Sequence, residues 1–157
     1  MSARLVLSSL AGVAVLGGVA AATVALVGTA DAAAARPTID KATATSVVLG
    51  TDSTESFTFT ATVTDDSGIK SVKVLAWPKS SKLDPKAAEM KDVESAICEA
   101  TSKKTSVCTY SLPIEPSKES ATMPTGTWNM AVLVTAKDGD TTYSAKASTF
   151  TVTRGNG

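Results

Sequence analysis

The sequence lacks histidine altogether and has no excess of charge of either sign. Among its 157 residues, 15 lysines and arginines balance 15 aspartates and glutamates. Histidine is the commonest general base and a frequent ligand of transition metals, so its absence excludes the usual Ser-His-Asp and Cys-His sites. Balanced charge also provides no positive field for a phosphate backbone. We therefore expect neither a common hydrolase mechanism nor a nucleic-acid partner.

The N-terminal segment differs in composition from the rest of the chain. Arg4 precedes a run of apolar and small residues from Leu5 to Gly28. The run is followed by Ala30-Asp31-Ala32, whose small side chains fit the subsites of a signal peptidase. The pattern predicts a signal peptide and short linker over residues 1–35, cleaved after Ala32 or a few residues later, and one domain over residues 36–157.

An uncleaved membrane anchor is the alternative interpretation of this segment, because about 20 apolar residues can span a bilayer. The Gly17-Gly18 pair and the Ala-x-Ala ending favour cleavage. We therefore expect a secreted, extracellular protein without a membrane span once the signal peptide has been removed.

Cysteine is nearly absent as well, since the chain has only Cys98 and Cys108. Outside the cytoplasm an even number of thiols normally forms disulfides. The two residues lie equally far from Lys103, so a hairpin centred there places them opposite each other, close enough to bridge. We predict a Cys98–Cys108 disulfide. A redox-active pair is the alternative, although no Cys-x-x-Cys motif is present.

Alternation of apolar and polar residues predicts several β-strands. Every second residue of segment 56–64 is apolar, and the others carry hydroxyl groups. The same period places one set of residues on a single face of segment 127–137: Trp128, Met130, Val132, Val134 and Ala136. Shorter alternating stretches occur within 69–77 and at Phe150 and Val152. Such strands have one buried face and one solvated face.

Turn-forming residues separate these strands. They are Asp65-Asp66-Ser67-Gly68, Pro78, Pro124-Thr125-Gly126 and Asp138-Gly139-Asp140. The long crossover helices that a parallel sheet needs are missing. We therefore predict an all-β fold, an antiparallel sandwich of two sheets.

One segment of the chain has helical rather than strand periodicity. Asp84 can cap a helix that starts at Pro85, and apolar residues then recur at roughly helical spacing: Leu83, Ala87, Met90, Val93 and Ile97. We predict a short helix over residues 84–95, inserted between sandwich strands, with an irregular loop as the alternative.

Two segments resemble bacterial immunoglobulin-like domains. Residues 126–140 with Phe150-Thr151-Val152 are similar to the last hairpin of such domains, and residues 63–74 to the connection between their second and third strands. With the signal peptide and the Cys-x9-Cys-x-Tyr stretch, the chain resembles uncharacterised secreted bacterial proteins that carry one such domain. The resemblance implies an immunoglobulin-like sandwich and no activity.

The two tryptophans are candidates for a carbohydrate platform, because their rings can stack on sugars. Trp128 shares a face with Met130 and Val132, which favours a place in the core. Trp77 alternates with Leu75 and lies on the opposite face from Val74. Apolar residues on both faces of that strand indicate that the insertion of residues 78–100 covers it, with a binding surface as the alternative.

The acidic turns are the one candidate metal site. In an immunoglobulin-like topology the turn at Asp65 and Asp66 and the turn at Asp138 and Asp140 emerge at the same end of the sandwich. Calcium takes six to eight oxygen ligands, largely from carboxylates. We therefore consider a calcium site at these four residues and expect no other cofactor. The alternative is that these aspartates are ordinary turn formers.

Taken together, these patterns predict a protein without enzymatic activity. We expect a secreted immunoglobulin-like module for extracellular binding, adhesion or cell-envelope association, whose partner is an unidentified protein, glycan or envelope component. The alternative is a secreted inhibitor or small-ligand carrier that uses residues 78–125 as its contact loop.

Overall fold

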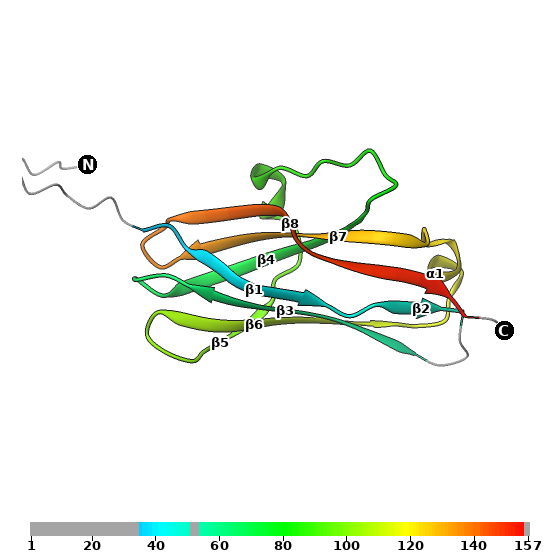
Figure 1. Ribbon diagram of the computed structural model, residues 1–157, viewed down its shortest axis with the longest axis horizontal. Coiled ribbons are helices and arrows are strands. Elements are labelled where there is room, and N and C mark those ends of the chain that lie inside the picture. Colours follow the sequence, from blue (N-terminus) through cyan, green and yellow to red (C-terminus); the bar gives the residue numbers. More distant parts are fainter. Residues whose placement is uncertain (1–34, 51–53, 156–157) are drawn as a thin grey trace, which may run out of the picture. The chain divides into compact units, whose positions relative to one another are not determined.

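Two four-stranded sheets make up most of the domain. The computed structural model describes residues 35–50 and 54–155, which belong to one compact unit, Ala32–Gly157. Sheet A has the strand order β1-β3-β6-β5, and sheet B the order β2-β8-β7-β4 (Figure 1). The elements are β1 (Thr38–Ala44), β2 (Val47–Leu49), β3 (Glu55–Thr64), β4 (Ile69–Pro78), η1 (Ala87–Lys91), β5 (Ile97–Ala100), β6 (Thr105–Ile114), α1 (Lys118–Thr122), β7 (Gly126–Ala136) and β8 (Thr141–Arg154). The all-β prediction is confirmed.

The predicted signal peptide and its cleavage site fall within residues 1–34, outside the described part of the chain. In the described ranges, no helix is long and apolar enough to cross a membrane.

The main core lies between the two sheets and follows the predicted alternation. Phe57, Phe59, Ala61 and Val63 of β3 are buried, whereas the threonines between them are half-buried. From sheet B, β7 and β8 contribute Met130, Val132, Val134, Phe150 and Val152 to the same cluster. A fully buried valine, phenylalanine or methionine side chain stabilises the fold by about 1.5–3 kcal/mol.

The first described strands connect the two sheets. β1 pairs antiparallel with β3 in sheet A, and β2 then pairs parallel with β8 in sheet B. The amide of Thr45 donates to the Thr58 carbonyl at 2.9 Å, which keeps the chain against sheet A until it crosses to sheet B. Every other strand pair in the two sheets is antiparallel.

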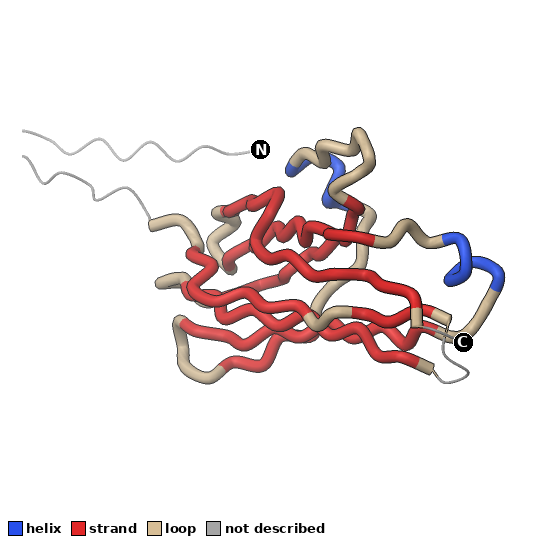
Figure 2. The backbone as a smooth tube through the Cα atoms, turned by 45° about the vertical axis from the view of Figure 1, so that its right-hand side comes forward, coloured by secondary structure: helices blue, strands red, loops and turns tan. Residues whose placement is uncertain are grey.

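The predicted helix over residues 84–95 is too long. Only one 3-10 turn forms, η1, and Lys86 rather than Asp84 caps it. The chain becomes extended afterwards because Glu94 and Ala96 make backbone hydrogen bonds to Val74 and Val72 of β4, each at 2.9 Å. Pairing with the edge of sheet B therefore overrides the helical pattern, and the helices of the domain are confined to two short peripheral segments (Figure 2).

The segment between β4 and β5 covers the part of sheet B's outer face that β4 and β7 form. Met90 of η1 is 0% exposed and packs with Trp77 and Ala131 in a second buried cluster. Leu75, Val93, Leu133 and Tyr143 pack around this cluster. The expectation that the insertion covers Trp77 is confirmed, and we call residues 79–96 the cover segment.

The inhibitor or carrier alternative treated residues 78–125 as one contact loop, but in the structure they do not form a single loop. They include β5 and β6, two of the four strands of sheet A, together with η1 and α1. The short helix α1 was not predicted. Its cap is Ser117, whose hydroxyl accepts a hydrogen bond from the Ser120 amide at 3.1 Å.

Candidate functional site

The disulfide forms as predicted. Cys98 of β5 faces Cys108 of β6, with their Cα atoms 4.0 Å apart, and the hairpin is centred at Lys103. Cys108 is fully buried in the main core. The bond therefore fastens the short edge strand β5 to the middle of sheet A, and the described part of the chain has no free cysteine.

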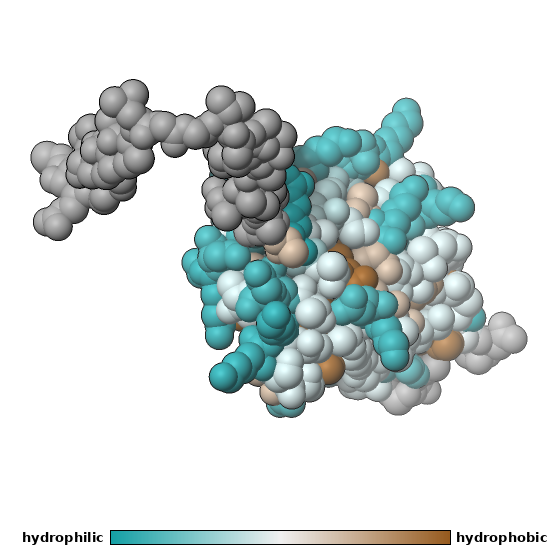
Figure 3. All heavy atoms as spheres, turned by 60° about the vertical axis from the view of Figure 1, so that its left-hand side comes forward, coloured by the Kyte–Doolittle hydropathy of each residue, from teal (hydrophilic) through white to brown (hydrophobic). Residues whose placement is uncertain are grey.

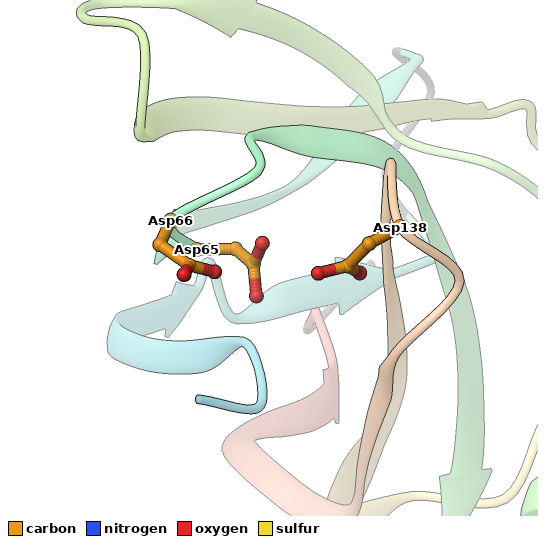
Figure 4. A group of neighbouring side chains, drawn as sticks. All are labelled: Asp65, Asp66 and Asp138. Atoms are coloured by element: carbon orange, nitrogen blue, oxygen red, sulfur yellow. The ribbon is translucent and has the colours of Figure 1, made fainter. Parts of the chain in front are cut away.

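Three of the four predicted aspartates converge at one end of the sandwich. Asp65 and Asp66 follow β3, and Asp138 follows β7. One carboxylate oxygen from each lies within 4.8 Å of the others, and the carboxylates of Asp65 and Asp138 point toward one another (Figure 4). We call these three residues the acidic cluster.

Asp140 lies outside the acidic cluster. Its amide donates to the Asp138 carboxylate at 3.0 Å, and its carbonyl accepts from the Ala136 amide at 2.8 Å. Asp140 thus closes the β7–β8 turn through its backbone. Asp140 is therefore an ordinary turn-forming residue, as the alternative to the calcium site predicted.

Ser67 holds the two acidic turns together. Its hydroxyl donates to Asp65 Oδ1 at 2.6 Å and accepts from the Asp138 amide at 3.2 Å. Its own amide also donates to Asp65 Oδ1, at 2.9 Å. The sequence pattern predicts Ser67 as part of a turn, since an aspartate followed by Ser two residues later can cap its own turn. The bridge from Ser67 to Asp138 was not predicted.

Gly68 allows the neighbouring turns to pack closely. Its φ is +89°, and a Cβ at this position would lie 2.9 Å from the Lys103 carbonyl oxygen. Its carbonyl accepts from the Lys137 amide at 2.9 Å. The β3–β4, β5–β6 and β7–β8 turns therefore meet at Gly68, where a side chain would separate them.

Burial distinguishes Asp65 from the other two members of the cluster. Asp65 is 3% exposed, whereas Asp66 and Asp138 are exposed. Both hydrogen bonds from Ser67 end on Oδ1, and Oδ2 is buried without any hydrogen-bond partner in the structure. A buried, unpartnered carboxylate oxygen is costly, so this atom needs a partner that the protein itself does not supply.

The outer face of sheet A is the second candidate site. Its side chains come from the outward positions of all four strands: Thr38, Lys41, Thr43, Thr58, Thr60, Thr62, Thr64, Ile97, Glu99, Thr105, Val107, Thr109 and Ser111. Hydroxyl groups meet across the strands, with Thr64 and Thr105 3.2 Å apart. None of these residues belongs to either buried cluster of the described chain. The face therefore has no cover comparable to that of sheet B.

Ile97 is the most exposed large apolar side chain in the described part of the chain, at 77%. The helical pattern had grouped it with Met90, but it stands on the outer side of β5 beside a shallow depression of about 300 Å³. The residues that line this depression are Ile97, Glu99, Val107, Thr109 and Ser111. Figure 3, turned so that the end with the acidic turns comes forward, shows hydrophilic and near-neutral residues over most of the visible surface, with only separated apolar spots.

Both tryptophans are engaged within the domain through their rings and indole N–H groups. Trp77 is 6% exposed, and its indole N–H donates to the Ala145 carbonyl at 3.3 Å. Trp128 is half-buried beside Phe150, with ring centroids 6.0 Å apart, and donates to the Pro124 carbonyl. Both rings therefore serve the packing of the domain.

The chain matches the model of a protein family. The model of DUF5707, a family of unknown function, matches residues 39–134. The chain belongs to this family. The DUF5707 match extends from β1 almost to the end of β7 and so includes Asp65, Asp66 and both cysteines, but it ends before Asp138. None of the curated proteins compared matches the chain.

Proposed function

We propose that this DUF5707 chain is an exported, non-catalytic immunoglobulin-like module that binds an extracellular partner. The strand orders support the immunoglobulin-like assignment. Immunoglobulin sandwiches place strands A, B, E and D in one sheet and C, F and G in the other. Sheet A follows the first order as β1-β3-β6-β5, and β4, β7 and β8 follow the second.

The disulfide supports export. Disulfides persist in oxidising compartments and are rare in the cytosol. The Cys98–Cys108 bond closes a short hairpin and attaches an edge strand. It is thus a stabilising cross-link of the kind found in secreted domains, in accordance with the predicted signal peptide.

The uncovered outer face of sheet A is the observation that carries the binding proposal. A sheet face with hydroxyl groups, little charge and the exposed Ile97 side chain offers hydrogen bonds and apolar contact together. These properties suit an uncharged polar surface, such as an envelope polysaccharide or a glycosylated protein. No proton transfer or covalent step is needed for this role.

A matched pair of variants tests this proposal. The purified full chain is incubated with envelope and secreted fractions of the producing culture, and sedimentation and capture are measured. We expect Ile97→Ser to weaken retention about fivefold or more, as removal of a central contact does. Leu83→Ser is the control, because Leu83 is also exposed, at 60%, but belongs to the cover segment.

A second candidate function is supported by the cover segment itself. A hollow of about 270 Å³ lies beneath it, lined by residues that include Trp77, Leu83 and Pro85. Its mostly apolar lining suits a small ligand, as in the inhibitor or carrier alternative. In that case Leu83→Ser would abolish capture and Ile97→Ser would not, which is the reverse of the result that the first proposal expects.

A further inference from the structure

We propose that the acidic cluster of Asp65, Asp66 and Asp138 binds one calcium ion, which fastens the β3–β4 turn to the β7–β8 turn. This inference does not depend on the binding face of sheet A, because the two sites share no residue.

The spacing of the three carboxylates fits a single calcium ion. Calcium–oxygen distances are about 2.3–2.6 Å, so two ligands on opposite sides of one ion lie about 4.6–5.2 Å apart. One oxygen from each carboxylate lies within 4.8 Å of the other two. All three oxygens can therefore contact the same ion, and water and main-chain carbonyls can complete its shell of six to eight ligands.

The unpartnered oxygen of Asp65 points independently to a ligand. Asp65 is more than nine-tenths buried, and its Oδ2 has no hydrogen-bond partner. Its Oδ1 is held by the amide and hydroxyl of Ser67, which fixes the carboxylate facing Asp138 (Figure 4). An ordinary turn-forming aspartate at the surface leaves no oxygen both buried and unpartnered.

No basic side chain in the described part of the chain neutralises the acidic cluster through an ion pair. Within residues 35–50 and 54–155, no lysine or arginine forms an ion pair with Asp65, Asp66 or Asp138. The Lys137 ammonium approaches the same region but lies against Gly68. Carboxylate groups at this spacing carry like charge, and a divalent cation between them replaces repulsion by attraction.

The two turns that the ion would join belong to different parts of the fold. Asp65 and Asp66 lie where the chain passes from sheet A to sheet B, whereas Asp138 lies between two strands of sheet B. Bound calcium would add a link between these turns to the hydrogen bonds that the Asp138 and Lys137 amides donate to the Ser67 hydroxyl and the Gly68 carbonyl. We therefore expect calcium to stabilise the folded domain.

Calorimetric titration of the purified full chain, with its disulfide intact, tests this site. We expect one calcium ion to bind with a dissociation constant of about 0.1–1 mM, the range of extracellular modules. At about 10 mM calcium chloride, the melting temperature should rise by about 3–10 °C over that in chelator. Sodium chloride of equal ionic strength should not reproduce the rise.

Three substitutions localise the response. Asp66→Asn and Asp138→Asn each remove one ligand charge from an exposed side chain and should weaken calcium binding about tenfold. The side-chain amide introduced by Asp138→Asn keeps an oxygen that can accept from the Asp140 amide, so the turn is preserved. Asp140→Asn removes the same charge from the same turn outside the cluster and should leave the calcium response unchanged.

Three results would overturn the proposal. The first is the absence of both heat and a shift in melting temperature at about 10 mM calcium in the unmodified chain. The second is an equal shift with sodium chloride, which would indicate general screening of charge. The third is a loss of response in Asp140→Asn as large as that in Asp138→Asn.

Discussion

The outer faces of the two sheets differ, although both sheets cover the same core. Over β4 and β7, sheet B is closed on its outer side by the cover segment, with Met90 at 0% exposure against Trp77. Sheet A carries threonines on its outer side and has no such cluster among the described residues. The β4–β7 half of sheet B is thus buried on both faces, whereas sheet A is buried only on its inner face.

The sequences of the strands explain this difference. β4 and β7 carry apolar residues at outward positions as well as inward ones, for example Leu75, Trp77 and Leu133. In β3, the outward positions are threonines, which suit a solvated strand face. A strand that is apolar on both faces needs a cover, so the remaining open face is the place to look for a partner.

Truncating a side chain under the cover segment and one on the outer face of sheet A should change the free energy of unfolding by very different amounts. We expect Met90→Ala to lower the free energy of unfolding by about 3 kcal/mol, because it leaves a cavity beneath the cover segment. Ile97→Ala on sheet A should change it by no more than about 0.5 kcal/mol, since the side chain is already exposed. Urea denaturation of both variants measures the difference, and equal losses would mean that the cover segment is not packed as described.

The edges of the two sheets are also held differently. The β4 edge is held by backbone pairing with the cover segment, whereas β5 is held by four paired residues and the disulfide. Reduction of the disulfide should therefore cost about 2–3 kcal/mol of stability, as expected for closure of a short loop. Urea denaturation with and without reductant measures this cost. Unchanged stability after reduction would show that β5 does not depend on the cross-link.

The smallest expected change in stability comes from the loss of one hydrogen bond that holds the cover segment. The Tyr143 hydroxyl donates to the Pro85 carbonyl, and Tyr143→Phe should cost about 0.5–1.5 kcal/mol of stability near pH 8. Partial burial, followed by the charge of Asp84, raises the pKa of Tyr143 above its usual value of 10.

The pH dependence of this hydrogen bond has a definite sign. Because the folded state holds the Tyr143 proton more tightly than the unfolded state, the contribution is complete below pH 10 and is lost as pH rises through the raised pKa. The stability gap between the unmodified chain and Tyr143→Phe should therefore narrow above pH 10. Urea denaturation of both proteins at pH 8 and pH 10.5 measures it, and a gap that widens would contradict this role.

Strict alternation made the core strands and the disulfide predictable. The period of two in segments 56–64 and 127–137 identified β3 and β7, and the symmetry about Lys103 identified the hairpin register. The length of the helix expected over residues 84–95 could not be predicted from periodicity, because the last part of this segment pairs with β4. That pairing depends on tertiary structure and leaves no local signal in the sequence.

The candidate sites were predictable to different degrees. Topology brought Asp65, Asp66 and Asp138 together as expected, but the backbone geometry of the turn decided that Asp140 stays apart. The bridging hydroxyl of Ser67 depends on the distance between two turns, which periodicity does not contain. The exposure of Ile97 was likewise not predicted. Helical spacing groups its side chain with Met90, whereas in the extended strand β5 it lies on the outer face of sheet A.

Hydrogen–deuterium exchange of the full chain, free and bound to the envelope fraction that retains it, is the most direct test of the central claim. If the outer face of sheet A is the contact surface, amides of residues 97–100 and 105–111 become protected on binding, while those of residues 79–86 in the cover segment do not change. Protection of residues 79–86 with no change in β5 and β6 would contradict the account and assign binding to the covered sheet.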